Sequence, residues 1–240
     1  MAERSTLYFE LREALEAGGC PLCRLRDQAS DSYLHALIYE GVTDPPLREE
    51  LRSARGLCHR HAWRQANRHG SVLGLAIIYH DVINTLTKTL EDQVPNRRFN
   101  RQGLVKRLGR SAECPACRLE RIALPRTIKT LLAYLDDPDI QTGYRNAGGL
   151  CLAHLQTTLG QANDAQARTL AEWQSVVYRE LRDQLSELIR KHDHRFKNEP
   201  IGVEGDAWRR AVARMAGEAG ETGHSDEEAR LGHFPPREVS

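Results

Sequence analysis

A pattern of cysteine and histidine residues occurs twice in this chain and limits what the chain can fold into. Each copy has a Cys-Pro-x-Cys motif followed by a Gly-Leu-Cys-x-x-His motif. The first motif repeats at an offset of 94 positions (114 − 20) and the second at an offset of 93 (151 − 58). All six cysteines belong to the two copies, which comprise Cys20, Cys23, Cys58 and His61, and Cys114, Cys117, Cys151 and His154. The sequence therefore predicts two related repeats.

The residue types and their spacing are typical of zinc sites. Tetrahedral Zn²⁺ takes four thiolate or imidazole ligands, and these ligands commonly occur in pairs with two residues between them. In the first copy His59 and His61 both follow Cys58, but the second copy has a single histidine, His154, which matches His61. We therefore expect two Cys3His sites with two Zn²⁺ per chain, and we expect His59 not to be a ligand.

We expect each site to form within one repeat, although Cys20 and Cys23 could instead meet Cys151 and His154 across the repeats. Within a repeat the two motifs are separated by only 35 positions (58 − 23) in the first copy and 34 (151 − 117) in the second. Closing a short loop costs less chain entropy than closing a long one, which favours the local arrangement.

The composition points to a helical protein without membrane spans. Aromatic residues make up only 6%, while Ala, Leu, Glu, Arg and Gln are plentiful, as in helices. The 34 basic and 33 acidic residues balance, so the overall charge does not favour nucleic acid or a membrane as partner. No apolar run reaches the length of a membrane span, and no signal segment begins the chain. We expect a cytoplasmic protein, in which such cysteines bind metal more often than they form disulfides.

The fold class that follows is all-α, with two pseudo-repeats of helices, each organised around a Cys3His metal site. Each repeat should contain the Cys-Pro-x-Cys motif, a helix, a short helix begun by Asp-Pro, the Cys-x-x-His turn and a long helix. The expected segments are repeat 1 (1–94), a basic linker (95–111), repeat 2 (112–196), a short C-terminal helix (197–217) and a disordered tail (218–240).

These motifs resemble those of an uncharacterised bacterial family, a domain of unknown function with duplicated CPxC…GLCxxH motifs. A late segment from Lys191 to Ala211, which contains Lys-His-Asp-x-Arg-Phe and Glu-Gly-Asp-Ala-Trp, is similar as well. The resemblance covers roughly residues 10–217. It implies a bacterial cytoplasmic protein with a metal site, and it implies no established activity.

The functional expectation is a zinc-binding scaffold or interaction protein rather than an enzyme. Both sites have four good ligands, whereas a catalytic zinc keeps one position open for water. The alternative is an iron–sulfur or thiol-redox protein that uses the Cys-Pro-x-Cys cysteines. The expected partner is another protein, and nucleic acid could bind only through the basic residues of segment 97–110. His192, Asp193 and His194 are adjacent, so they should face different directions on a helix and are expected to be solvated or packed.

Overall fold

The computed structural model describes residues 5–93, 99–196 and 198–219, and in these ranges the chain forms helices and no strands. This confirms the all-α prediction. The helices are α1 (Thr6–Glu16), α2 (Pro21–Tyr39), α3 (Pro45–Ser53), α4 (His59–Ala66), α5 (Val72–Glu91), α6 (Arg101–Leu108), α7 (Pro115–Ala133), α8 (Pro138–Asn146), α9 (Leu152–Leu159), α10 (Asp164–Lys191) and α11 (Ala207–Ala216).

The repeat expected from the sequence is present in the order of the helices. The series α2, α3, α4, α5 matches the series α7, α8, α9, α10. Asp44 and Asp137 are the N-caps of α3 and α8, each followed by a proline in the first turn, where a missing backbone N–H costs nothing. The long helix α10 begins with a reciprocal capping box between Asn163 and Gln166. Local sequence signals therefore account for where these helices begin.

The described chain divides into two compact units, and this division differs from the expected segments 1–94 and 112–196. The first unit comprises the residues up to Ser30 together with those from Leu119 onward, and the second comprises Asp31–Arg118. Both boundaries fall inside a helix, one in α2 and one in α7. Each unit therefore contains elements of both repeats.

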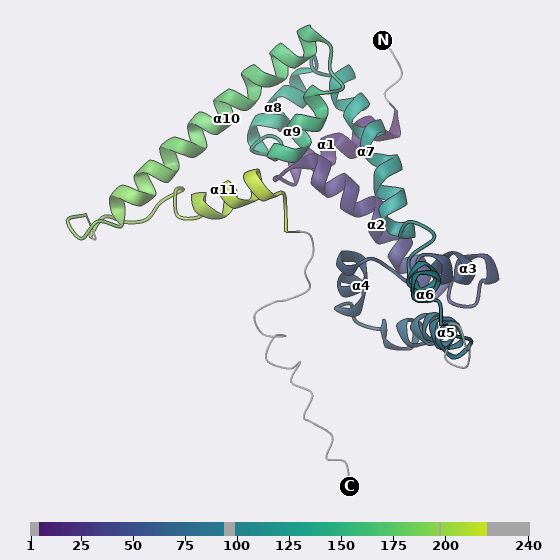
Figure 1. The fold of residues 1–240 in the computed structure, drawn as a ribbon. Coiled ribbons are helices and arrows are strands. Elements are labelled where there is room, and N and C mark those ends of the chain that lie inside the picture. Colours follow the sequence, from purple (N-terminus) through teal and green to yellow (C-terminus); the bar gives the residue numbers. More distant parts are fainter. Residues whose placement is uncertain (1–4, 94–98, 197, 220–240) are drawn as a thin grey trace. The chain divides into compact units, whose positions relative to one another are not determined.

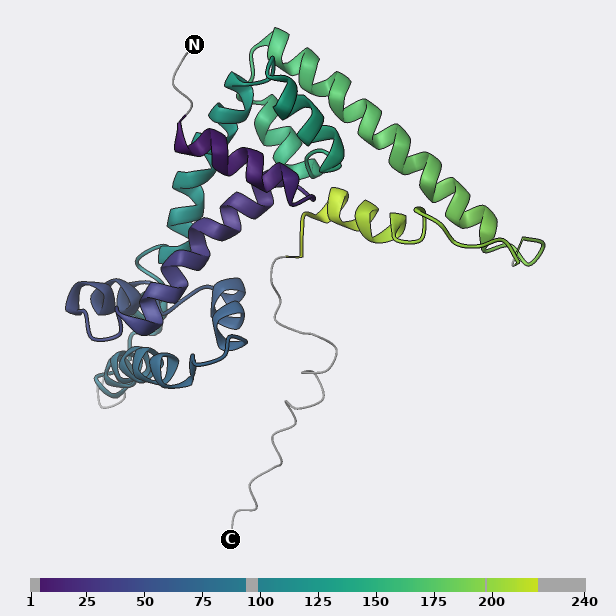
Figure 2. The same ribbon diagram turned by 180° about the vertical axis from the view of Figure 1, so that it is seen from behind.

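The core of the first unit is formed by α1, the beginning of α2, the later part of α7, and α8 to α10. Helix α1 packs on α8, α10 packs on α8 and α11, and α11 packs on α9. Figures 1 and 2 show α11 turning back from the far end of α10 toward α9. Among the fully buried side chains are Tyr8, Leu11, Ile128, Leu131 and Tyr144. This packing surrounds the start of α2 with helices of the second repeat.

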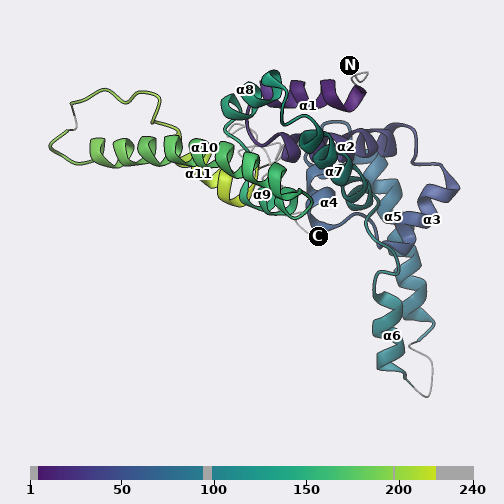
Figure 3. The same ribbon diagram turned by 90° about the horizontal axis from the view of Figure 1, so that it is seen from above.

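The second unit has a smaller core built from the end of α2, α3, α4, α5 and the start of α7. Its buried residues include Leu34, Leu37, Leu51, Leu57 and Ile78. Helix α5 packs against α3 and α6, and Figure 3 shows α6 lying beside α5. The start of α7 therefore belongs to a core made otherwise by the first repeat.

The segments outside the repeats follow the predictions in part. The expected linker 95–111 contains helix α6, and residues 94–98 lie outside the described residues. Arg110 in this segment donates a hydrogen bond to the carbonyl of Leu57. The C-terminal helix expected in 197–217 is α11, whereas most of the expected tail, residues 220–240, lies outside the described residues. None of the described helices is both long and apolar enough to cross a membrane.

Candidate metal centres

Each Cys-Pro-x-Cys motif lies at the start of a 19-residue helix. Cys20 and Cys114 directly precede the prolines that begin α2 and α7, so Cys23 and Cys117 lie in the first helical turn. The backbone N–H groups of a first turn carry partial positive charge, which stabilises thiolates placed there. The proline is tolerated because its position needs no N–H donor.

Each Cys-x-x-His motif starts a short helix in a similar way. Cys58 and Cys151 are the N-caps of α4 and α9, with extended backbone conformations. His61 and His154 follow three residues later, which places each histidine on the same helical face as its cysteine. Each Cys-Pro-x-Cys or Cys-x-x-His motif is one half of a four-residue set and is called a half-motif below. All the half-motifs therefore present their side chains from helix N-termini.

The first cluster consists of Cys20, Cys23, Cys151 and His154, all of them buried. The Nδ1 atom of His154 lies 3.5 Å from Sγ of Cys20, 3.3 Å from Sγ of Cys23 and 3.3 Å from Sγ of Cys151. The Sγ atoms of Cys23 and Cys151 are 3.7 Å apart. One sulfur or nitrogen atom of each residue thus faces a common centre.

The second cluster consists of Cys58, His61, Cys114 and Cys117, with Cys58 and Cys117 only partly buried. Nδ1 of His61 lies 3.2 Å from Sγ of Cys58, 3.6 Å from Sγ of Cys114 and 3.4 Å from Sγ of Cys117. The Sγ atoms of Cys58 and Cys117 are 3.5 Å apart. The two clusters have nearly the same dimensions, as expected for copies of one motif.

The structure corrects the expected pairing of the half-motifs, because each cluster combines one motif from each repeat. The sets expected within the repeats were Cys20, Cys23, Cys58 and His61, and Cys114, Cys117, Cys151 and His154. The loop-closure argument failed because it treats the intervening chain as flexible. Helix α2 has 19 residues and α3 only nine. Most of the chain between Cys23 and Cys58 is helical, so it does not close as a flexible loop of the same length would.

The histidines that were expected not to be ligands lie outside both clusters. His59 is exposed, and its ring lies edge-on to Trp63, with ring centroids 6.4 Å apart. His192 contacts the carbonyl oxygen of Leu188 through Nδ1 at 2.8 Å. Asp193 contacts both Arg195 and His194, and neither Asp193 nor the two histidines belong to a candidate metal group among the described residues.

Steric constraints explain why each Gly-Leu-Cys-x-x-His motif begins with glycine. Gly56 and Gly149 have φ values of 78° and 71°, a left-handed conformation that side chains disfavour. A Cβ atom at Gly149 would lie 2.6 Å from Oε1 of Gln174, and one at Gly56 would lie 2.8 Å from the ring of Tyr79. Gln174 and Tyr79 belong to the long helices, which therefore approach the turn closely. Sequence reasoning missed Gln174, because a lone glutamine in an amphipathic helix carries no signal.

The ligand side chains shift one another's pKa values. Burial acts to lower the pKa of His154, but hydrogen bonds with Cys151 and Cys20 outweigh it and raise the pKa to about 9. Hydrogen bonds with Cys20 and Cys23 lower the pKa of the Cys151 thiol. Burial opposes ionisation of Cys114, yet hydrogen bonding with His61 lowers its pKa to about 6. The shifts differ between the cysteines, because hydrogen bonding with Cys151 raises the pKa of Cys23 and burial raises the pKa of Cys117 to about 12. Cys114 and Cys151 are therefore the thiols that ionise most readily, and the thiolate is the form that binds metal.

The chain is similar to proteins of unknown function. Residues 4–222 match a protein family described as a family of unknown function (DUF6062). An uncharacterised 23.9 kDa protein encoded in the xynA 3′ region of Caldicellulosiruptor sp. (strain Rt8B.4) is 27% identical over 204 residues, which cover 82% of this chain and 95% of that protein. No solved structure matches the chain.

Proposed function

The chain belongs to the DUF6062 family of unknown function, and we propose that it is a zinc-binding helical scaffold that presents its helices to another protein. Each Cys3His cluster would hold one Zn²⁺. The proposal places the protein in the cytoplasm, where thiols remain reduced and available to metal.

The observation that carries the proposal is the size of the clusters. A tetrahedral zinc ion with Zn–S near 2.3 Å and Zn–N near 2.0–2.1 Å needs about 3.7 Å between two sulfurs and about 3.5 Å between sulfur and nitrogen. In the first cluster the sulfurs of Cys23 and Cys151 are 3.7 Å apart and the three sulfurs lie 3.3–3.5 Å from the histidine nitrogen. In the second cluster the sulfurs of Cys58 and Cys117 are 3.5 Å apart and the three sulfurs lie 3.2–3.6 Å from that nitrogen. All the sulfur and nitrogen atoms of a cluster lie within 4.8 Å of one another. A polynuclear iron–sulfur cluster binds its ligands through different irons and needs wider spacing. The dimensions therefore favour a single ion.

The ligand set favours a structural role over a catalytic one. Four protein ligands fill the coordination sphere of a tetrahedral ion and leave no position for water or substrate. Three thiolates and one Zn²⁺ leave a net charge of −1, and the two helix N-termini at each cluster stabilise that charge. These features support a metal that holds helices together.

Zinc in these positions would join distant parts of the chain. The ligands of the first cluster are separated by up to 134 positions across its two half-motifs, and those of the second by up to 59. Structural zinc contributes on the order of 10 kcal/mol to the folding of small domains. A metal in each unit would thereby tie the two repeats to one another.

Exposed apolar side chains support a protein partner. Trp208, Val212 and Met215 lie at helical spacing on α11, and each is more than half exposed. The Trp208 side chain is an amphipathic group that interfaces favour. The 97–110 segment offers weaker support for nucleic acid, because Arg110 is already bonded to the carbonyl of Leu57.

The proposal is tested by native mass spectrometry and elemental analysis of full-length protein purified without oxygen. We expect two zinc ions per chain and no absorbance in the visible region. Iron with thiolate-to-iron charge-transfer absorbance would overturn zinc in favour of an iron protein. Metal-free chains with oxidised cysteine pairs would overturn metal binding and favour a thiol-redox protein.

A further inference from the structure

Helix α11 brings a buried arginine to one half of the first cluster. The side chain of Arg214 is about 5% exposed. Its guanidinium donates hydrogen bonds to the carbonyl oxygens of Ala147, at 3.1 Å, and Gly149, at 3.3 Å. These carbonyls belong to the turn that precedes Cys151. Arg214 therefore holds the turn that presents the Cys-x-x-His half of the cluster.

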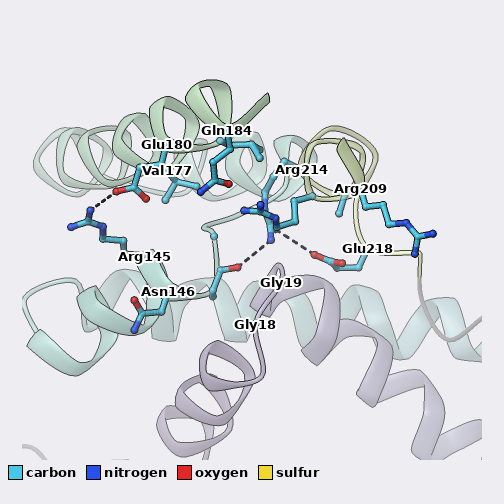
Figure 4. Close-up of a pocket in the computed structure, with 15 residues that line it drawn as sticks. Gly18, Gly19, Arg145, Asn146, Val177, Glu180, Gln184, Arg209, Arg214 and Glu218 are labelled. Carbon is cyan, nitrogen blue, oxygen red and sulfur yellow. Dashed lines mark hydrogen bonds and ion pairs between the residues drawn. The ribbon is translucent and has the colours of Figure 1, made fainter. Parts of the chain in front are cut away.

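A carboxylate four residues later reaches the other half. Oε1 of Glu218 accepts a hydrogen bond of 2.8 Å from the backbone N–H of Cys20 and lies 3.4 Å from the Arg214 guanidinium. Gly19 has φ 78°, and a Cβ atom at this position would lie 2.8 Å from the carboxylate, which would then have to shift. Figure 4 shows the Arg214 guanidinium between the backbone of the turn and the Glu218 carboxylate.

The backbone between these two residues lies directly over the cluster. Gly217 has φ 91°, and a Cβ atom at this position would be 3.7 Å from Sγ of Cys23 and 4.0 Å from Sγ of Cys151. One short segment thus contacts both half-motifs through two charged side chains and the chain between them. The second cluster is less enclosed, because Cys58 and Cys117 are only partly buried.

We propose that Arg214, Gly217 and Glu218 form a clasp that closes the first cluster and sets how fast its metal is released, so that the second cluster exchanges its metal first. This inference rests on the proposed function. The half-motifs of the first cluster cannot separate until the bonds from Arg214 and Glu218 break, because each side chain holds a different half and the two are paired. A chelator or an alkylating reagent reaches the sulfurs only after the clasp opens.

The test uses full-length zinc-loaded protein incubated with a chelator and N-ethylmaleimide, followed by peptide mass spectrometry. Wild-type protein should be labelled at Cys114 and Cys117 well before Cys20 and Cys23. Glu218→Ala should raise the labelling rate of Cys20 and Cys23 about tenfold, equivalent to ~1.4 kcal/mol in the opening equilibrium. The rates at Cys114 and Cys117 should not change.

Glu180→Ala is the matched control for Glu218→Ala. Glu180 lines the same pocket and pairs with Arg145, so its removal should leave all labelling rates as in wild type. Arg214→Ala should raise the labelling rate of Cys20 and Cys23 as Glu218→Ala does. Its matched control is Arg209→Ala, because the guanidinium of Arg209 is exposed and lies over the Trp208 ring. Circular dichroism identifies any variant that fails to fold, and Glu218→Ala keeps the test decisive because it leaves the buried Arg214 in place.

Two results would overturn the clasp. One is an unchanged labelling rate of Cys20 and Cys23 in Glu218→Ala, and the other is a wild-type protein whose first cluster releases metal no later than its second. A chain that holds no metal would refute the proposed function separately. In that case the control of metal release is refuted as well, and faster labelling of Cys20 and Cys23 in Glu218→Ala supports only that the clasp closes the cluster.

Discussion

The side-chain amide of Gln174 is hydrogen bonded to both backbone groups of Leu150, the residue before the candidate ligand Cys151. Oε1 accepts from the N–H at 3.0 Å, and Nε2 donates to the carbonyl at 3.2 Å. The hydroxyl of Tyr144 also donates to Oε1 of Gln174. Gln174 is buried in α10. Helix α10, the longest of the described helices, therefore fixes the turn that presents one half of the first cluster.

Replacing Gln174 with leucine should destabilise the first unit strongly. The change leaves the N–H and carbonyl of Leu150 and the hydroxyl of Tyr144 buried without partners, at a cost of about 3 kcal/mol in the free energy of unfolding. The urea midpoint of unfolding, measured by circular dichroism, checks this. Gln161→Leu is the control, because Gln161 is exposed. A midpoint equal to that of wild type would show that the hydrogen bonds contribute nothing.

Gly149→Ala should be poorly tolerated although it adds one methyl group. The φ of 71° at Gly149 costs a non-glycine residue about 1–2 kcal/mol, and the new Cβ would displace Gln174 from Leu150. We expect a lower melting temperature and weaker metal retention. Gly160→Ala is the control, because Gly160 has φ −67° and its Cβ would meet no atom closer than 3.5 Å. Equal melting temperatures for the two variants would contradict the explanation.

Pairs of cysteine substitutions distinguish ligand sets across the repeats from sets within them. Cys20 and Cys151 belong to one cluster, while Cys20 and Cys58 belong to different clusters. Cys20→Ser combined with Cys151→Ser should therefore lose one metal ion and retain one. Cys20→Ser combined with Cys58→Ser should lose both. Native mass spectrometry counts the ions, and the reverse result would establish sites within each repeat.

Two neighbouring histidines should differ completely in their effect on metal content. His61 is buried with Nδ1 facing three sulfurs, whereas His59 is exposed on the same helix. His61→Ala should reduce the metal content by one ion per chain, and His59→Ala should leave it unchanged. Metal loss in both variants would indicate that the substitutions disturb helix α4 as a whole and that His61 has no specific role in metal binding.

Glu204 should stabilise the link between α10 and α11 in a pH-dependent way. The N–H of Gly202 and the ammonium of Lys191 hold its carboxylate and lower its pKa from 4.5 to about 2. A lowered pKa contributes stability that is complete above pH 4.5 and lost as the pH falls toward 2. Glu204→Gln should therefore lower the denaturant midpoint at pH 7, and the difference should shrink below pH 4.5. Glu172→Gln, at an exposed position of α10, is the control, and a gap that stays constant with pH would refute the assignment.

Local sequence signals were sufficient for most of the helices and for the candidate ligands, whereas α6 lies in the segment that was expected to be a linker. Asp-Pro dipeptides marked the starts of α3 and α8, and the repeat of Cys-x-x-His singled out His61 over His59. These features depend on a few neighbouring residues and on spacing along one helix face, which the sequence contains in full. The all-α class and the eight residues of the two clusters followed from the same signals.

The tertiary structure alone decided which half-motifs meet. Cys23 and Cys58 are only 35 positions apart (58 − 23), yet Cys23 meets Cys151 in one cluster and Cys58 meets Cys117 in the other. The same holds for Gln174, Arg214 and Glu218, which act on backbone groups far away in the chain. A contact between distant segments depends on how whole helices pack, and no single segment encodes it.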